Sequence, residues 1–342
     1  MFSVFGQMFF SLVTPMLVHT PEQLGVILLV QWPPAIAVAV ASWLLLVERP
    51  PSPPSASAAL QWKEAAAAQA SAKHRDAPAL VALEEMWHDV RALFENVNFL
   101  CLAAGFAVGT GTVWALLILV EQFINPCGYS DSLAGVAGAS LLGAGIVAAF
   151  GVGAAMEYTK AYVTLQRAIM VAALVSTGAL LLLIQPGHAM RLIGAFCLVG
   201  CALQPLYPLS LEHAAEQTFP IPADASTAVM LVGANTFSFI LVLVLTPLLA
   251  SPSYKACTTP ITPAACVTIT CMAAGLMFTL LVRPQYVRSK AEMKRRQGSS
   301  GIGAMLGEDW GVDSPNAATG QQAPLLGKGD DAAGGYGAAA PP

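Results

Sequence analysis

Residues 209–238 read LSLEHAAEQTFPIPADASTAVMLVGANTFS, and this polar stretch separates two long apolar runs, 189–211 and 227–249. Its acidic residues are Glu212, Glu216 and Asp224. An apolar helix of about 20 residues crosses the roughly 30 Å hydrocarbon core of a bilayer, and both flanking runs reach that length. The stretch is therefore expected to be a loop between two membrane-spanning helices, with a polar residue, Asn235, about two turns inside the second one.

The composition extends this expectation to the whole chain. Of the 342 residues, 56% are hydrophobic and 11% are charged, whereas soluble domains carry about 25% charged residues. The sequence predicts an all-α, polytopic protein that passes several times through a membrane. The lipid bilayer is therefore its expected partner.

Several classes of function lack their sequence signatures. Basic residues are not pooled in a patch that would bind nucleic acid. The 7 cysteines form no CxxC pair and no Cys/His cluster, so neither a metal site nor a redox motif is expected. No H-E-x-x-H motif and no nucleophile–base pair is visible, so the chain is not expected to be an enzyme or to hold a cofactor.

Uninterrupted apolar runs predict about eight membrane spans. They lie at roughly 1–18, 24–47, 99–124, 134–156, 166–184, 189–211, 227–249 and 263–282. Between the second and third spans, residues 48–98 begin with a Pro/Ser/Ala-rich linker and end with apolar residues at helical spacing, which predict a helix in the membrane interface. Residues 283–342 are expected to form a tail that is disordered in its Gly/Ala/Pro-rich part.

Lysine and arginine predict the orientation. If the spans alternate, every basic residue except Arg191 and Lys255 falls on one side of the membrane. Because basic residues mark the cytoplasmic side, the 48–98 linker, the turn near residue 160, the acidic stretch and the tail are predicted to be cytoplasmic.

Three side chains inside the spans are candidates for binding a solute. Trp114 lies near the middle of its span, where an indole face in a cavity attracts a quaternary ammonium by about 1 to 2 kcal/mol. Asn235 and Gln204 are uncharged amides within spans. Core packing for Trp114 and hydrogen bonding between helices for the two amides are the alternative interpretations.

Other features of the spans also have two interpretations. Gly105 and Gly109 form a small-xxx-small pair, and the span at 134–156 is rich in glycine. Such glycines allow close packing of helices in any bundle, or they form the surfaces that rock against each other in a transporter. Glu157 and Lys160, an acid and a base in the glycine-rich turn after that span, could simply be solvated loop charges.

The sequence also resembles a known family. The segments ERPPSPPSASAA (48–59), WALLILVEQF (114–123), MEYTKAY (156–162) and PLSLEHAAEQTFPIPADAST (208–227) resemble, in the same order along the chain, the feline leukaemia virus subgroup C receptor family, solute carrier family 49 of the major facilitator superfamily. The resemblance covers nearly all of residues 1–285.

The resemblance implies a major facilitator superfamily helical bundle of two six-span halves, of which this chain matches spans five to twelve. Residues 1–47 would be the last two spans of the N-terminal half, 48–98 the central linker and 99–282 the six-span C-terminal half. Family members are associated with choline and ethanolamine transport, and haem export has been proposed. Trp114 stands where choline carriers have a tyrosine, and Asn235 where they have a glutamine.

The sequence also departs from the family pattern at several positions. The caging tryptophan of span one has no counterpart here, and the glutamine of span five falls nearest to Val4, with Gln7 one turn on. Glu157 and Lys160 keep the acid and the lysine of a gating turn but lack its arginine. The acids Glu212 and Glu216 match a pair expected to gate by binding basic groups of the other half.

The predicted function is alternating-access transport of a small organic solute, a choline- or ethanolamine-like cation or haem. Trp114, Asn235 and Gln204 would bind it, and Glu157, Lys160, Glu212 and Glu216 would gate its passage. The alternative is a truncated, non-transporting membrane protein that acts as a partner or structural subunit.

Overall fold

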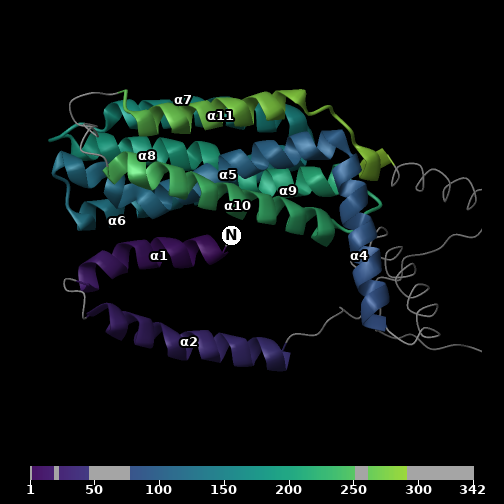
Figure 1. The fold of residues 1–342 in the computed structure, drawn as a ribbon, viewed down its shortest axis with the longest axis horizontal. Helices are drawn as coiled ribbons and strands as arrows, with labels where there is room; N and C mark the ends of the chain where they lie inside the picture. The colour runs from purple at the N-terminus through teal and green to yellow at the C-terminus, as the bar shows by residue number, and fades with distance from the viewer. Residues whose placement is uncertain (1, 19–22, 46–77, 251–260, 291–342) are drawn as a thin grey trace, which may run out of the picture. The chain divides into compact units, whose positions relative to one another are not determined.

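The computed structural model describes residues 2–18, 23–45, 78–250 and 261–290, all of which fall in one compact unit, 1–295. Every regular element in these ranges is helical, which confirms the all-α prediction (Figure 1). In chain order the elements are α1 Phe2–Leu17, α2 Gln23–Leu45, α4 Pro78–Glu95, α5 Val97–Ile124, η1 Asn125–Cys127, α6 Asp131–Thr159, α7 Tyr162–Leu183, α8 Ala189–Leu203, α9 Leu206–Gln217, α10 Ala223–Ala250 and α11 Pro263–Leu281.

The predicted spans all coincide with helices. Seven segments of the described chain are long and apolar enough to cross a membrane, and α8 and α9 together form one of them. The apolar part of α1, Val4–Pro15, is shorter than the others. The chain is therefore a multi-pass membrane protein.

Short polar side chains begin three of the helices. The Asn96 side chain accepts hydrogen bonds from the backbone N–H groups of Asn98 and Phe99, each at 3.1 Å, and so caps α5. Ser130 caps α6, and Thr262 caps α11 with Pro263 directly after it. These caps satisfy N–H groups that have no partner inside the helix, which explains why the helices begin there.

Helix α5 is the centre of the packing. It lies along α10 and α11 and also contacts α9 and α6, while α6 packs on α8 and α1 (Figure 1). Its side chains at Phe99, Phe106 and Leu116 are buried. Two hydrophobic clusters, one around Phe99 and the other around Leu116, share this helix.

The small-residue pair of α5 brings neighbouring helices close. A Cβ atom at Gly105 would overlap the side chain of Thr279 and lie 3.4 Å from the carbonyl oxygen of Gly275, so the backbone of α11 approaches here. At Gly109, the nearest atoms belong to the side chains of Leu206 and Met170. The predicted close approach is thus present at Gly105, whereas Gly109 makes room for side chains.

Helices α6 and α8 pack more closely still. A Cβ atom at Gly200 would overlap the carbonyl group of Leu141, and one at Gly145 would overlap the side chain of Gln204. Gly151, further along α6, has no such neighbour within 4 Å. Close packing therefore explains the glycines in the middle of α6 but not those near its end, and a rocking surface stays a prediction.

The opening stretch differs from its predicted structure. Residues 189–211 were expected to form one span followed by a loop, but α8 ends at Leu203 and α9 continues to Gln217. Helix α10 then begins at Ala223, so the connection is only 218–222. The loop prediction was wrong for Glu212 and Glu216, which lie on α9, and for Asp224 in the first turn of α10. Glutamate has a good helix propensity, so acidic residues alone do not mark a loop.

The span interrupted between α8 and α9 is broken at Gln204 and Pro205. The N–H of Gln204 still donates to the carbonyl oxygen of Gly200 at 3.0 Å. Pro205 has no N–H to donate, which interrupts the ladder of helical hydrogen bonds, although Gln204 and Pro205 keep helical backbone angles, with φ of −63° and −64°. The backbone N–H of Leu209 donates to the carbonyl oxygen of Pro205 at 3.3 Å as α9 resumes.

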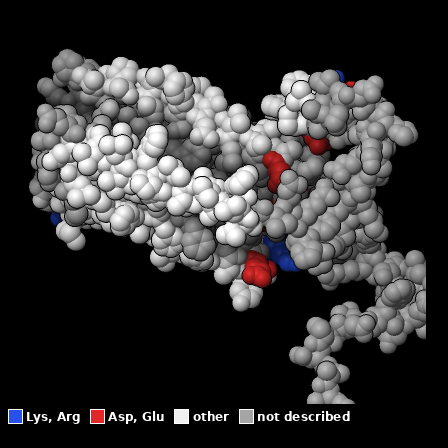
Figure 2. Space-filling model, turned by 90° about the horizontal axis from the view of Figure 1, so that it is seen from below, with Lys and Arg blue, Asp and Glu red and all other residues white. Residues whose placement is uncertain are grey.

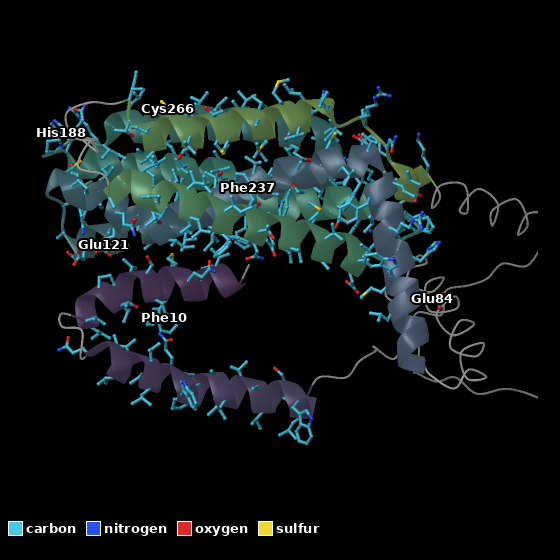
Figure 3. The ribbon with its side chains drawn as sticks, in the orientation of Figure 1. Phe10, Glu84, Glu121, His188, Phe237 and Cys266 are labelled. Atoms are coloured by element: carbon cyan, nitrogen blue, oxygen red, sulfur yellow. The ribbon has the colours of Figure 1, made fainter. Side chains whose placement is uncertain are left out.

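The two ends of the bundle differ in their content of lysine and arginine. Every described lysine or arginine except Arg191 lies at the end where α4 meets α5, or on α4 itself. Glu121 and His188 mark the opposite end, and Glu84 lies on α4 (Figure 3). This asymmetry agrees with the predicted orientation, which would make the α4 end cytoplasmic.

Helix α4 coincides with the helix predicted near the end of the 48–98 segment. Its apolar side chains Leu83, Met86, Trp87 and Phe94 are exposed. Its placement in the membrane interface stays a prediction. Residues 48–77 of the predicted linker and 291–342 of the predicted tail lie outside the described residues.

The α6–α8 contact generates a stability prediction. We expect Gly200→Ala to lower the free energy of unfolding by about 1–3 kcal/mol, because the added methyl group meets the rigid backbone of Leu141. Thermal unfolding of the purified protein in detergent measures this. Gly194→Ala on the same helix is the matched control, since a Cβ atom there has no neighbour within 4 Å. Equal melting temperatures for the two variants would contradict the close packing.

Candidate functional site

Two adjoining cavities lie between the helices of the bundle. The larger, of about 750 Å³, is an open space between α1, α5, α6 and α10. The smaller, of about 120 Å³, is more enclosed and lies between α1, α5, α6 and the start of α9. Gln7, Trp114 and Leu117 line both, so these residues form the boundary at which the two spaces meet.

The large cavity is mainly apolar. Its aromatic and aliphatic lining comprises Phe10, Trp114, Leu117, Ile118, Leu142, Phe239 and Val242, and its polar lining Gln7, Ser11, Asn235 and Ser238. Helix α1, which carries Phe10, runs along one side of this space, and α10 runs along the other (Figure 3). No residue of this lining is charged.

Asn235 takes up a defined position on α10. Its side-chain nitrogen, Nδ2, donates to the carbonyl oxygen of Leu231 at 2.9 Å, one turn earlier on the helix. Among the described residues, its Oδ1 has no hydrogen-bond partner, and the residue is exposed to the cavity. The amide is therefore held by its donor side while its acceptor is available to a ligand.

The small cavity lies at the break between α8 and α9. The break contributes Gln204, Tyr207 and Pro208, and α6 contributes Gly145, Ile146 and Ala149. Because Gln204 packs directly on Gly145, the close α6–α8 contact also positions a cavity-lining amide. The lining again contains no charged residue.

The structure brings the predicted binding residues together around Trp114. Trp114 and Asn235 line the large cavity, and Trp114 and Gln204 line the small one. Trp114 is half-buried, so part of its ring is accessible. Of the two positions considered on the first helix, Val4 lines only the small cavity, whereas Gln7 lines both.

Sequence reasoning missed Tyr207. It lies between Pro205 and Pro208, and prolines inside an apolar run are the signal for an interrupted helix. Interrupted spans line the binding sites of many transporters. That signal predicts an interrupted helix at Tyr207, and only the structure places the residue beside a cavity.

A second polar region lies at the α4 end of the bundle, where the chain leaves α11. We call residues 282–290 the terminal strap. The side chain of Asn98 donates to the carbonyl oxygen of Arg283 at 3.0 Å and accepts from its N–H at 2.7 Å. The Arg167 guanidinium donates to the carbonyl oxygens of Leu280 at 2.9 Å and Val282 at 2.8 Å. Side chains of α5 and α7 thus hold the chain just after α11.

Two of the predicted gating acids hold the far part of the terminal strap. The Glu216 Oε1 atom accepts a hydrogen bond from the backbone N–H of Ser289 at 2.7 Å, and Glu216 is only 5% exposed. Glu212 forms an ion pair with Arg288 at 3.8 Å. Both acids therefore bind a segment of their own half of the sequence, and pairing with the other half stays a prediction.

The other predicted gating residues are at the surface. Glu157 and Lys160 are exposed and form no ion pair with a described residue. Lys160 has φ of +50° and its N–H donates to the carbonyl oxygen of Met156 at 2.9 Å, so it ends α6 in the left-handed conformation. On the face shown in Figure 2, described acids and bases gather toward the α4 end, and the rest of the bundle is nearly free of them.

A buried polar cluster beneath the terminal strap was also missed. The Nδ1 atom of His213 lies 2.8 Å from Oε1 of Gln166, whose Nε2 atom donates to Ser210 at 3.3 Å. The ring of Tyr162 stacks on His213, and Tyr286 of the strap packs against Tyr162. The sequence placed His213 in a loop, and only its position on α9 reveals the cluster.

The strap contacts generate a testable prediction. A hydrogen bond to a buried carboxylate contributes about 1.5–3 kcal/mol, so Glu216→Ala is expected to release the terminal strap and speed tryptic cleavage after Arg288 at least about tenfold. Mass spectrometry of the product ending at Arg288 measures the rate. Glu157→Ala, an exposed acid at the same end, is the control. Equal rates for both variants would show that Glu216 does not hold the strap.

Comparison with known proteins finds distant relatives over most of the chain. No protein-family model matches the chain. Solute carrier family 49 member A3 of Danio rerio is 25% identical over 297 residues, which are 84% of this chain and 58% of that protein. The protein of the same name in Xenopus tropicalis is 26% identical over 224 residues, 65% of this chain and 42% of that protein. The chain is thus distantly related to solute carrier family 49 member A3 over most of its length, and it spans about half the length of these curated relatives.

Proposed function

We propose that this chain carries the solute-binding cavity of a membrane transporter that works by alternating access. The observation that carries the proposal is the pair of adjoining cavities between membrane-spanning helices, which meet at Gln7, Trp114 and Leu117. Polar groups within the spans of a membrane protein are costly unless they have a use, and here Gln7, Gln204 and Asn235 line two adjoining cavities. The distant relationship to proteins named as solute carriers supports the same function.

The proposed ligand is a small organic cation of the choline or ethanolamine type. The Trp114 indole face attracts a cation, and the Asn235 Oδ1 atom accepts a hydrogen bond from a hydroxyl or ammonium group. Gln204 supplies a second amide in the small cavity. Haem is a weaker candidate, because neither described lining contains a lysine or arginine to bind its carboxylates.

The proposed gating region is the α4 end. Glu212 and Glu216 hold the terminal strap on α9, while Glu157 and Lys160 end α6 close to the start of α7. Because α7 and α9 also meet the cavity helices, release of the strap would favour one access state over the other. In the family arrangement proposed here, 1–47 would belong to one half of the transporter and 99–282 would be the other half.

Equilibrium binding tests the proposal. We expect purified protein in lipid nanodiscs to bind labelled choline saturably, and Trp114→Ala to weaken binding about tenfold, since the loss of a desolvated cation–π contact costs up to about 2 kcal/mol. Trp114→Phe, which keeps an aromatic face, should lose less. Uptake of choline and ethanolamine by transport-deficient cells expressing the chain then tests transport.

A control variant tests whether the effect on binding is specific to Trp114. Trp32→Ala on α2 removes an exposed tryptophan that lines neither cavity and should leave binding unchanged. Equal binding by wild type and Trp114→Ala would contradict the site. Binding without uptake would favour the second candidate, a non-transporting membrane protein that acts with a partner subunit.

A further inference from the structure

The break between α8 and α9 gives the small cavity a second aromatic wall. Tyr207 lines this cavity together with Trp114, and the two residues come from different helices, α9 and α5. Gln7 and Gln204 add two amides to the same lining. Two aromatic faces with neighbouring carbonyl-type acceptors are the arrangement that suits an alkylated or primary ammonium group.

Tyr207 is held in place for such a role. Its ring packs against that of Phe106, which is fully buried, with ring centroids 5.9 Å apart and planes at 51°. Its backbone N–H donates to the carbonyl oxygen of Gln204 at 3.3 Å, within the turn that interrupts the span. Its hydroxyl has no hydrogen-bond partner among the described residues, and the residue is half-buried. The fold therefore fixes the ring while leaving one side of it accessible from the cavity.

The two cavities differ in what they can hold. The small one, of about 120 Å³, is close to the size of a compact ammonium head, and a larger share of its lining is polar. The large one, of about 750 Å³, exceeds the volume of choline several-fold and is lined mainly by side chains such as Phe10, Ile118 and Phe239. A ligand that filled both would have a small cationic head and an uncharged, apolar body.

We propose that Tyr207 and Trp114 together form a head-group compartment for an amphipathic organic cation whose apolar body occupies the large cavity. This rests on the proposed function and narrows its substrate class. No acid lines either cavity, so the cation would be bound by aromatic faces and amide oxygens rather than by a counter-ion. Solutes that carry a carboxylate or phosphate would be disfavoured for the same reason.

The first experiment uses the wild-type protein and tests whether the large cavity binds the apolar body of the ligand. Equilibrium dialysis of the purified full chain in nanodiscs compares tetramethylammonium, butyltrimethylammonium and hexyltrimethylammonium below their micellar concentrations. Burial of one methylene strengthens binding about fourfold, so affinity should rise steeply along the series. Protein-free nanodiscs measure partition into lipid. A series with equal affinities, after this correction, would overturn the proposal that the large cavity holds an apolar body.

The head-group compartment is tested with variants of Tyr207. Tyr207→Ala should weaken tetramethylammonium binding about five- to tenfold, whereas Tyr207→Phe should retain it because the aromatic face is kept. Tyr158→Ala is the control, since Tyr158 is 88% exposed at the end of α6. If Trp114→Ala weakens binding and Tyr207→Ala does not, the compartment is refuted and the proposed function stands. If neither variant changes binding, the proposed site itself is wrong.

Discussion

The structure depends on one constraint of the bilayer: at membrane depth no water is available to the backbone, so each N–H and C=O group needs a partner inside the protein. Helices meet it along almost the whole described chain, and polar caps such as Asn96 meet it where helices begin. The break at Gln204 and Pro205 is compatible with it because proline brings no N–H and because the break lies beside a cavity. The interrupted span described here therefore adds Gln204 and Tyr207 to the polar side chains that α1 and α10 bring to the cavities.

Close packing of the helices determines where the cavity-lining side chains lie. In a membrane, helices gain little from the hydrophobic effect when they associate, so small residues that let backbones touch are what hold them together. Gly200 against Leu141 fixes α8 on α6, and Gly105 fixes α5 beside α11. With α5 and α8 placed in this way, Trp114 and Gln204 line the same small cavity, although they are 90 positions apart in the sequence.

Much of the fold could be predicted from the sequence, because the signal for a span is local: about 20 consecutive apolar residues. The end of α9 could not, since Glu212 and Glu216 look like loop residues until their partners in the terminal strap are known. The partners lie more than 70 positions away, and no local pattern encodes such a pairing.

The site was accessible to sequence reasoning only in part. Trp114, Asn235 and Gln204 stand out as polar or amphipathic residues in apolar runs, and the structure places all three at the cavities. Tyr207 does not stand out, because tyrosines are common near the ends of spans. What separates it from them is the helix break, and the break follows from two prolines whose effect depends on the packing around them.

The contact between Gly145 and Gln204 has a consequence for how such a protein can change over time. The same pair of residues determines how closely two helices pack and where an amide stands in the small cavity. A substitution that enlarged Gly145 would move the amide as well as the helix, and one that reshaped Gln204 would alter the helix contact. Ligand preference and fold stability are therefore not independent here, and a new selectivity at this position would have to arise through paired substitutions rather than single ones.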